Sequence, residues 1–179
     1  VIRTNLDSCF NMTKQVMDGM TERKWGRVIN VSSVNGQKGA FGQTNYSAAK
    51  AGVVNLTRTL GIEAARHGVR VNAVAPGGIL SSGLGRYPAE VQEMAAAVLA
   101  QVPAARLGTE AEVAAAVVFL ASPASAFTTG ATLRVDGGGS LAKTAFVPLE
   151  AHDRLPPWSG FHRSSAAPSR FVRERDDPA

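Results

Sequence analysis

Residues 27–74 constrain the fold of this 179-residue chain more than any other stretch. Residues 27–32 are apolar and β-rich, which predicts a buried strand that ends at Ser33. A glycine-rich loop follows, and the apolar periodicity then predicts a helix over 44–67. The β-branched run over 69–74 predicts the next strand. A strand, a helix and a second strand in this order favour a parallel α/β arrangement.

Two side chains with acid–base chemistry stand four residues apart on the predicted helix. Tyr46 and Lys50 therefore lie one above the other on one helix face. The reference pKa of tyrosine is about 10, and a nearby fixed cation favours the phenolate. The hydroxyl of Ser33 could hold a substrate carbonyl against Tyr46. The plainer alternative is a core tyrosine, a loop serine and a solvated lysine, and the spacing alone leaves both readings open.

A second loop is expected at the same end of the sheet. The strand over 69–74 runs into Pro76, Gly77 and Gly78. Ligands of open parallel α/β sheets bind beyond the carboxyl ends of the strands, so this loop and Ser33 should face one cleft. The alternative is that the Pro-Gly-Gly run is only a turn.

Composition narrows the class of protein. Hydrophobic residues make up 45% of the chain and charged residues 18%, which is typical of one globular domain. A single cysteine, Cys9, excludes an internal disulfide and favours a reducing, cytoplasmic compartment. The net charge of +5 is spread out without a basic block, which argues against nucleic-acid binding. The apolar runs are too short to cross a membrane. His67, His152 and His162 have no partner at metal-ligand spacing, so no metal site is expected.

Further elements are expected on either side of this unit. Residues 3–24 carry an apolar stripe with helical periodicity, and residues 90–101 a shorter one. Residues 82–87 are mixed glycine and serine, which predicts a flexible loop. A capping box of Thr109 and Glu112 opens a helix that ends before Pro123, and residues 131–135 form a last strand. The segment 140–179 holds five of the nine prolines and no periodic apolar pattern, so we expect mostly disorder there.

The stretch around Tyr46 resembles a known family. Ser33, Tyr46 and Lys50, within "GRVINVSSVNGQKGAFGQTNYSAAKAG", look like the catalytic set of the short-chain dehydrogenase/reductases. The text is most similar to the bacterial acetoacetyl-CoA reductases and somewhat less similar to the 3-oxoacyl-acyl-carrier-protein reductases. The resemblance covers residues 1–139, which it implies are the C-terminal catalytic part of a doubly wound Rossmann-type sheet with helices on both faces. It ends before the atypical segment 140–179.

The resemblance assigns roles to four residues. It implies that Tyr46 donates a proton to the substrate, and that Lys50 holds the nicotinamide ribose and lowers the pKa of that tyrosine. It implies that Ser33 orients the substrate carbonyl. The family's matching asparagine bends its helix and anchors a proton relay, a role that falls here on Asn5. From the residues alone, Asn5 would be a tolerated surface asparagine.

The resemblance also implies binding positions. On the cofactor side the matching residues are Tyr46, Lys50, Pro76, Gly77, Gly78, Ile79 and Ser81. On the substrate side they are Ala40, Phe41, Gly42, Gln43 and Gly78. Gly78 departs from the family, which places an aromatic ring there against the acyl group. The resemblance therefore does not predict how the acyl chain would pack at this position. Phe41 could equally serve loop packing, and Gln43 could be a surface residue.

The implied reaction is the NADPH-dependent reduction of a 3-oxoacyl thioester. The best guess is acetoacetyl-CoA to 3-hydroxybutyryl-CoA, the step that feeds polyhydroxyalkanoate synthesis. NAD(H) stays as the alternative cofactor, and reduction on acyl carrier protein as the alternative reaction. A hypothesis from a different functional class is that the chain is an inactive, truncated fragment that dimerises. The resemblance implies a homodimer through the helices over 3–24 and 44–67, and a tetramer of the longer protein.

In the family, the glycines that bind the dinucleotide lie on the N-terminal side of the stretch that this sequence resembles. They belong to an N-terminal half, with four strands of a seven-stranded sheet, that this sequence does not contain. The strand over 27–32 would then become an open sheet edge. We therefore expect this chain alone to be marginally stable or to aggregate, and to bind dinucleotide poorly.

Overall fold

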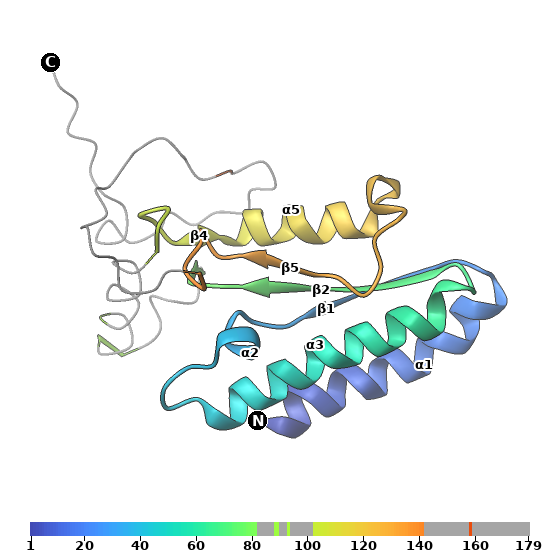
Figure 1. The fold of residues 1–179 in the computed structure, drawn as a ribbon, viewed down its shortest axis with the longest axis horizontal. Helices are drawn as coiled ribbons and strands as arrows, with labels where there is room; N and C mark the ends of the chain where they lie inside the picture. Colours follow the sequence, from blue (N-terminus) through green and yellow to red (C-terminus); the bar gives the residue numbers. More distant parts are fainter. Residues whose placement is uncertain (82–87, 90–92, 94–101, 142–157, 159–179) are drawn as a thin grey trace, which may run out of the picture.

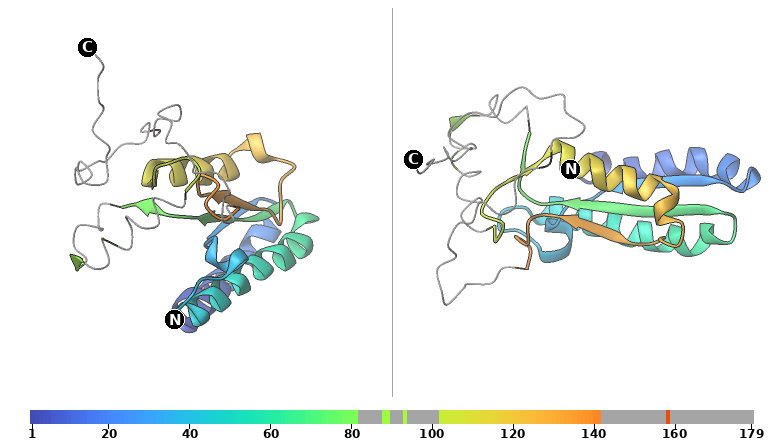
Figure 2. Two further views of the ribbon diagram at one scale, coloured as in Figure 1. Left: turned by 60° about the vertical axis from the view of Figure 1, so that its left-hand side comes forward. Right: turned by 90° about the horizontal axis from the view of Figure 1, so that it is seen from above.

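A three-stranded parallel sheet lies between two layers of helices in the computed structural model (Figure 1). The structure describes residues 1–81, 88–89, 93, 102–141 and 158. The sheet has the order β1-β2-β5, formed by β1 (Gly26–Val31), β2 (Val69–Pro76) and β5 (Thr132–Val135). Helices α1 (Ser8–Glu22) and α3 (Thr44–Ala65) cover one face, and α5 (Glu110–Ala121) covers the other (Figures 1 and 2). The expected α/β fold with a parallel sheet is confirmed.

The central strand β2 organises the core. Its register with β1 runs from Gly26 opposite Val69 to Val31 opposite Val74. Every residue of β2 before Pro76 is buried, as expected of a parallel strand with a helix layer on each face. On the α3 side, Val69 and Val71 form one buried cluster with Ala64, against which Met17, Met20, Val28 and Leu60 pack.

Strand β1 differs from the expectation for residues 27–32. Only Gly26 and Asn30 of the strand are buried, and Val31 is 51% exposed. The prediction of a buried strand was wrong because β1 pairs with β2 on one side only among the described residues. Its other edge is open, as the missing neighbour led us to expect.

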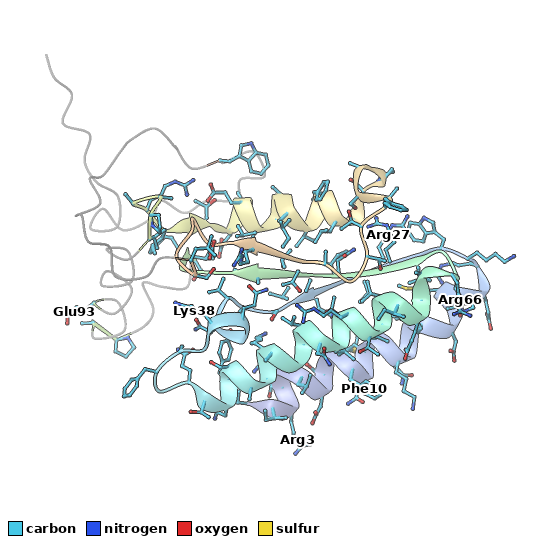
Figure 3. The ribbon with its side chains drawn as sticks, viewed as in Figure 1. Arg3, Phe10, Arg27, Lys38, Arg66 and Glu93 are labelled. Carbon is cyan, nitrogen blue, oxygen red and sulfur yellow. The ribbon has the colours of Figure 1, made fainter. Side chains whose placement is uncertain are left out.

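The first helix begins with a π-helical turn. A continuous helix was expected over 3–24, whereas η1 (Arg3–Asp7) precedes α1. Its expected apolar stripe is covered only in part, since Thr13 is buried and two methionines pack on the core, while Phe10 and Val16 are 51% and 40% exposed. Phe10 lies on the side of α1 that is turned away from the sheet (Figure 3). The described part of the chain therefore leaves an apolar surface on this helix.

Helix α3 packs as its sequence predicts. Ala49, Val53 and Ala64 of the expected stripe are buried, while Leu56 and Leu60 are half-buried. Gly52 lets η1 approach closely, because a Cβ there would stand 2.7 Å from Leu6 Cδ2.

The opposite layer is anchored at both ends of α5. Thr109 and Glu112 form the predicted capping box at its start. The helix ends at Ala121, before the short 3-10 turn η3 (Pro123–Ser125). The guanidinium of Arg70 on β2 then donates to three carbonyl oxygens, those of Leu120, Ser122 and Thr128, at 3.0 to 3.1 Å. Strand β5 begins one residue later than predicted, at Thr132.

Two small features were not expected. A single helical turn, α2 (Asn35–Lys38), stands where a plain glycine loop was predicted. Strand β3 (Ile79–Leu80) pairs with β4 (Gly108–Thr109) in a separate two-stranded sheet. The predicted loop over 82–87 lies outside the described residues, as do nearly all of the predicted helix over 90–101 and most of the segment 140–179.

Candidate active site

The site is built at the carboxyl end of β1, where the chain turns out of the sheet. Ser32 N donates to Val74 O at 2.8 Å and Val34 N donates to Pro76 O at 3.1 Å, so this turn is fixed to the end of β2. Ser33 lies between them, 8% exposed. Its Oγ accepts from the backbone N–H of Asn35 at 3.2 Å, at the start of α2. The sequence placed Ser33 at a strand end, and the structure places it there.

Helix α2 packs directly on α3 without a side chain between them. A Cβ at Gly36 would stand 2.6 Å from the carbonyl carbon of Lys50, closer than real Cβ contacts. Figure 3 shows Lys38 of the same turn at the end of the sheet toward which the strands point. The glycine thus brings the turn after Ser33 against the backbone of the helix that carries Tyr46 and Lys50.

The expected substrate loop follows α2. The side-chain amide of Asn35 donates to Gln43 Oε1 at 2.9 Å and closes the segment between them. Gly39 and Gly42 adopt φ of 75° and 73°, which glycine adopts readily and other residues rarely do. Ala40 is half-buried between them, and Phe41 is fully exposed.

Helix α3 brings Tyr46 and Lys50 to the end of β1. The Lys50 ammonium stands 5.7 Å from the centroid of the Tyr46 ring, within the range of a cation–π contact. Lys50 Nζ donates to Val31 O at 2.9 Å, and its own backbone carbonyl accepts from Ser32 Oγ at 2.9 Å. Lys50 is therefore tied at both ends to the two residues before Ser33.

Burial sets the electrostatics of this lysine. Lys50 is 8% exposed. Burial lowers the pKa of its ammonium below the ordinary value, and the nearby Cys9, when ionised, acts in the opposite direction. A lysine held this way carries a positive charge that little water screens, beside an aromatic ring that bears a hydroxyl.

Asn5 lies in the π-helical turn η1. Its side-chain amide donates to Val1 O at 3.1 Å, and its backbone carbonyl accepts from the thiol of Cys9 at 3.3 Å. A bend was expected at Asn5, and the turn that holds it is π-helical, a form that often marks functional sites. The hydrogen bonds of Asn5 in the described part of the chain stay within its own helix, and none of them reaches Tyr46.

The loop after β2 lies beside the turn that carries Ser33. Gly77 N donates to Val135 O at 3.0 Å, and a Cβ at Gly77 would stand 2.6 Å from Asp136 Cβ, so β5 holds this turn closely. Gly78 O accepts from Gly108 N at 2.9 Å, which continues the pairing of Ile79 with β4. Pro76 through Ser81 are half-buried.

The structure thus brings most of the expected positions to one end of the sheet. Ser33, Tyr46 and Lys50 gather around the last residues of β1, and Pro76 is bonded to the same turn. Sequence reasoning missed the bonds of Lys50 to Val31 O and from Ser32 Oγ, because each of them uses a main-chain carbonyl, which leaves no signal in a sequence. It also missed the bond from Asn35 to Gln43. The available signal was an asparagine beside a glycine-rich turn, since asparagine side chains often form hydrogen bonds in turns.

Two further features are absent from the described residues. Within the described residues, no group of three or more His, Cys, Asp or Glu side chains could hold a metal ion. No helix in the described part of the chain is both long and apolar enough to span a membrane.

Comparison with known proteins decides the family. A family model described as enoyl-(acyl carrier protein) reductase matches residues 1–140. The chain belongs to the short-chain dehydrogenase/reductase family. This member is 50% identical over 138 residues to an acetoacetyl-CoA reductase of Cupriavidus necator. The match covers 77% of this chain and 55% of that protein.

Other relatives carry different names. A protein of Azospirillum brasilense named nodulation protein G is 51% identical over 138 residues, and a 3-oxoacyl-(acyl-carrier-protein) reductase of Vibrio cholerae is 50% identical over the same length. Each match again covers 77% of this chain and 55% of the relative. This reductase-family chain therefore spans about half the length of the curated relatives it matches.

Proposed function

We propose that this chain is the catalytic part of a reductase that converts a 3-oxoacyl thioester to the 3-hydroxyacyl thioester, with acetoacetyl-CoA as the best candidate substrate. The observation that carries the proposal is the placement of Lys50 between the end of β1 and the Tyr46 ring. Names of relatives support the substrate class. Residues 1–139 would form the catalytic part, and 140–179 a separate tail.

The residues present fit the nicotinamide side of a dinucleotide. A buried ammonium at Lys50 can donate to ribose hydroxyls, and the half-buried loop from Pro76 to Ser81 offers backbone groups and one hydroxyl. We propose NADPH as the cofactor, with NAD(H) as the alternative. When bound, it would supply the hydride.

Each side chain has a separate task in the proposed reaction. Ser33 donates a hydrogen bond to the substrate carbonyl and orients it. Tyr46 then gives its hydroxyl proton to the oxygen that becomes the alcohol, while the Lys50 ammonium stabilises the phenolate that remains. Asn5 would hold a water that returns a proton toward Lys50. Phe41 and Gln43, on the loop closed by Asn35, would contact the acyl thioester.

The apolar surface on α1 supports the expected homodimer. Phe10 and Met12 on α1 are 51% and 67% exposed, and Ile62 on α3 is 78% exposed. Large apolar side chains gathered on neighbouring helices are typical of subunit interfaces. We propose that α1 and α3 form the face through which two copies associate.

A fusion tests the activity. The part of the Cupriavidus necator relative that has no counterpart here is joined in front of this chain, and NADPH oxidation is followed with acetoacetyl-CoA and with acetoacetyl-acyl-carrier protein. We expect turnover with the CoA thioester, and turnover restricted to the carrier protein would favour the alternative reaction. Tyr46→Phe should lower kcat by about 100-fold to 10,000-fold.

A matched control separates catalysis from structure. Tyr46→Phe keeps the ring beside Lys50 and removes only the hydroxyl, so the melting temperature should stay close to that of the unchanged fusion. Equal and near-zero turnover in both proteins, with both folded, would instead favour the non-catalytic dimerising fragment.

A further inference from the structure

The N-terminus of α5 lies next to the candidate nicotinamide loop. Thr109, the N-cap of α5, is also the last residue of β4, which pairs with Leu80. One residue earlier, Gly108 N donates to Gly78 O at 2.9 Å. Because of these bonds, a contact that fixes the N-terminus of α5 also fixes the loop from Gly78 to Leu80.

A residue from far along the chain is bound to this helix start. Thr109 Oγ1 donates to the carbonyl oxygen of Trp158 at 3.2 Å, and Trp158 N donates to Glu112 Oε1 in a longer contact of 3.4 Å. Both partners belong to the capping box. The two side chains that cap the helix thus also bind the N–H and the C=O of one peptide residue.

Glu112 is positioned for this contact by other bonds. Arg106 donates to both of its carboxylate oxygens, at 2.9 and 2.6 Å, and Thr109 N donates to Oε2 at 2.9 Å. The bidentate pair fixes the plane of the carboxylate. Oε1 is therefore held in one direction, as a fixed acceptor for an incoming backbone N–H.

The sequence around Trp158 bears on the contact that its N–H makes. Pro156 and Pro157 precede it, and proline has no backbone N–H to donate. Trp158 carries the first N–H after these two residues. The backbone N–H and C=O of Trp158 both make contacts here, and the residue is 44% exposed.

We propose that the N-terminus of α5 is a docking surface for Trp158 of the same chain, which it holds through the backbone N–H and C=O of that residue. Docking stabilises the hydrogen-bonded join between β4 and the loop from Gly78 to Leu80. The docking does not depend on the proposed function, which enters only in what that loop would bind. Trp158 is thus anchored, although it belongs to the segment 140–179, for which composition predicts mostly disorder.

The test compares Trp158→Pro with Trp158→Ala in the full 179-residue chain. Alanine removes the indole and keeps the N–H, whereas proline removes the N–H that Glu112 accepts. Amide hydrogen exchange at Gly108 should be about two-fold to ten-fold faster in the proline variant than in the alanine variant, the range for one lost hydrogen bond. Equal exchange in the two variants would overturn the proposal.

A second measurement uses the carboxylate itself. Burial acts to raise the pKa of Glu112, but bonds from Arg106, Thr109 and Trp158 hold it below its ordinary value. An NMR titration should therefore show a higher pKa for Glu112 in Trp158→Pro than in Trp158→Ala. Identical titration curves would count against docking.

A second variant pair covers the case in which the proline variant does not fold. Thr109→Val removes the hydroxyl that donates to Trp158, and Thr109→Ser keeps it. In a Trp25→Phe background, acrylamide should quench Trp158 more strongly in the valine variant than in the serine variant. Equal quenching would overturn the proposal. Since no cofactor or substrate is used, these results stand apart from the outcome of the reductase assay.

Discussion

The ammonium of Lys50 donates a 2.9 Å hydrogen bond to the carbonyl oxygen of Val31, the last residue of β1. The N–H of Ser32, in the same trans peptide unit, points the opposite way and donates to Val74 of β2. The Val31 carbonyl therefore faces the open edge of the sheet. In this structure Lys50 satisfies a main-chain acceptor that a neighbouring strand would otherwise bind.

A pH-dependent stability follows from the burial of Lys50. Because burial lowers its pKa, the folded chain binds this proton less tightly than the unfolded chain does. Stability should therefore rise as the pH increases from the lowered pKa to the ordinary value of 10.5. Lys50→Met should lose this rise, as measured by urea unfolding at several alkaline pH values, with exposed Lys14→Met as the control. Parallel profiles for the unchanged chain and Lys50→Met would contradict this account.

Gly36 should tolerate no side chain. A Cβ at this position would meet the backbone of Lys50 at 2.6 Å, and backbone cannot move aside cheaply. Gly36→Ala should lower the free energy of unfolding by about 1–3 kcal/mol, the range for overpacking. Gly19→Ala is the matched control, since its Cβ would meet only Arg23 Nη1 at 3.5 Å within α1. That substitution should stabilise the chain by about 0.5–1 kcal/mol. Chemical denaturation measures both, and equal effects would argue against close packing of α2 on α3.

Arg70 should act as a clamp between β2 and the end of α5. Its guanidinium donates to three carbonyl oxygens, and removing it would leave buried acceptors without these bonds. Arg70→Met should cost about 3 kcal/mol of stability, within the range for unsatisfied buried groups. Arg134→Met, at an exposed arginine of β5, should cost less than about 0.5 kcal/mol. Thermal unfolding compares the two, and a similar loss in both would show that the three bonds are not what matters.

The open edge of β1 should control association of the chain. Val31 is 51% exposed there, and uncovered apolar edge strands pair with other chains. Val31→Lys should reduce aggregation, because a charged side chain on the edge opposes strand pairing. Light scattering at rising concentration measures this. Val118→Lys, on an exposed position of α5, is the control for a general gain in solubility. If it suppresses aggregation equally well, the edge is not the cause.

Local signals predicted much of this structure. The capping box of Thr109 and Glu112 involves residues three apart, and it is present as expected. The i, i+4 spacing of Tyr46 and Lys50 depends only on helix geometry, so the contact between their side chains was within reach of sequence reasoning. The parallel pairing of β1 with β2 follows from the long helix between them.

Features that depend on distant partners were beyond such reasoning. Whether Val31 is buried depends on a neighbouring strand, and its own side chain carries no information about that strand. The turn α2 rests on the close approach of Gly36 to Lys50, fourteen positions away in the printed sequence. The bond from Thr109 to Trp158 spans 49 residues and uses a main-chain oxygen. Composition alone predicted mostly disorder over 140–179.

The bond between Asn35 and Gln43 closes the segment that carries Ala40 and Phe41. This closure makes the segment a self-contained loop that could be replaced as a unit. Gly39 and Gly42 have open space around them, so the loop makes few demands on the scaffold beneath it. Loops of equal length from related reductases could be transplanted between positions 39 and 42 while the two anchoring amides are kept. If this loop contacts the acyl thioester as proposed, its selectivity could then be changed without any change to the helix that carries Tyr46 and Lys50.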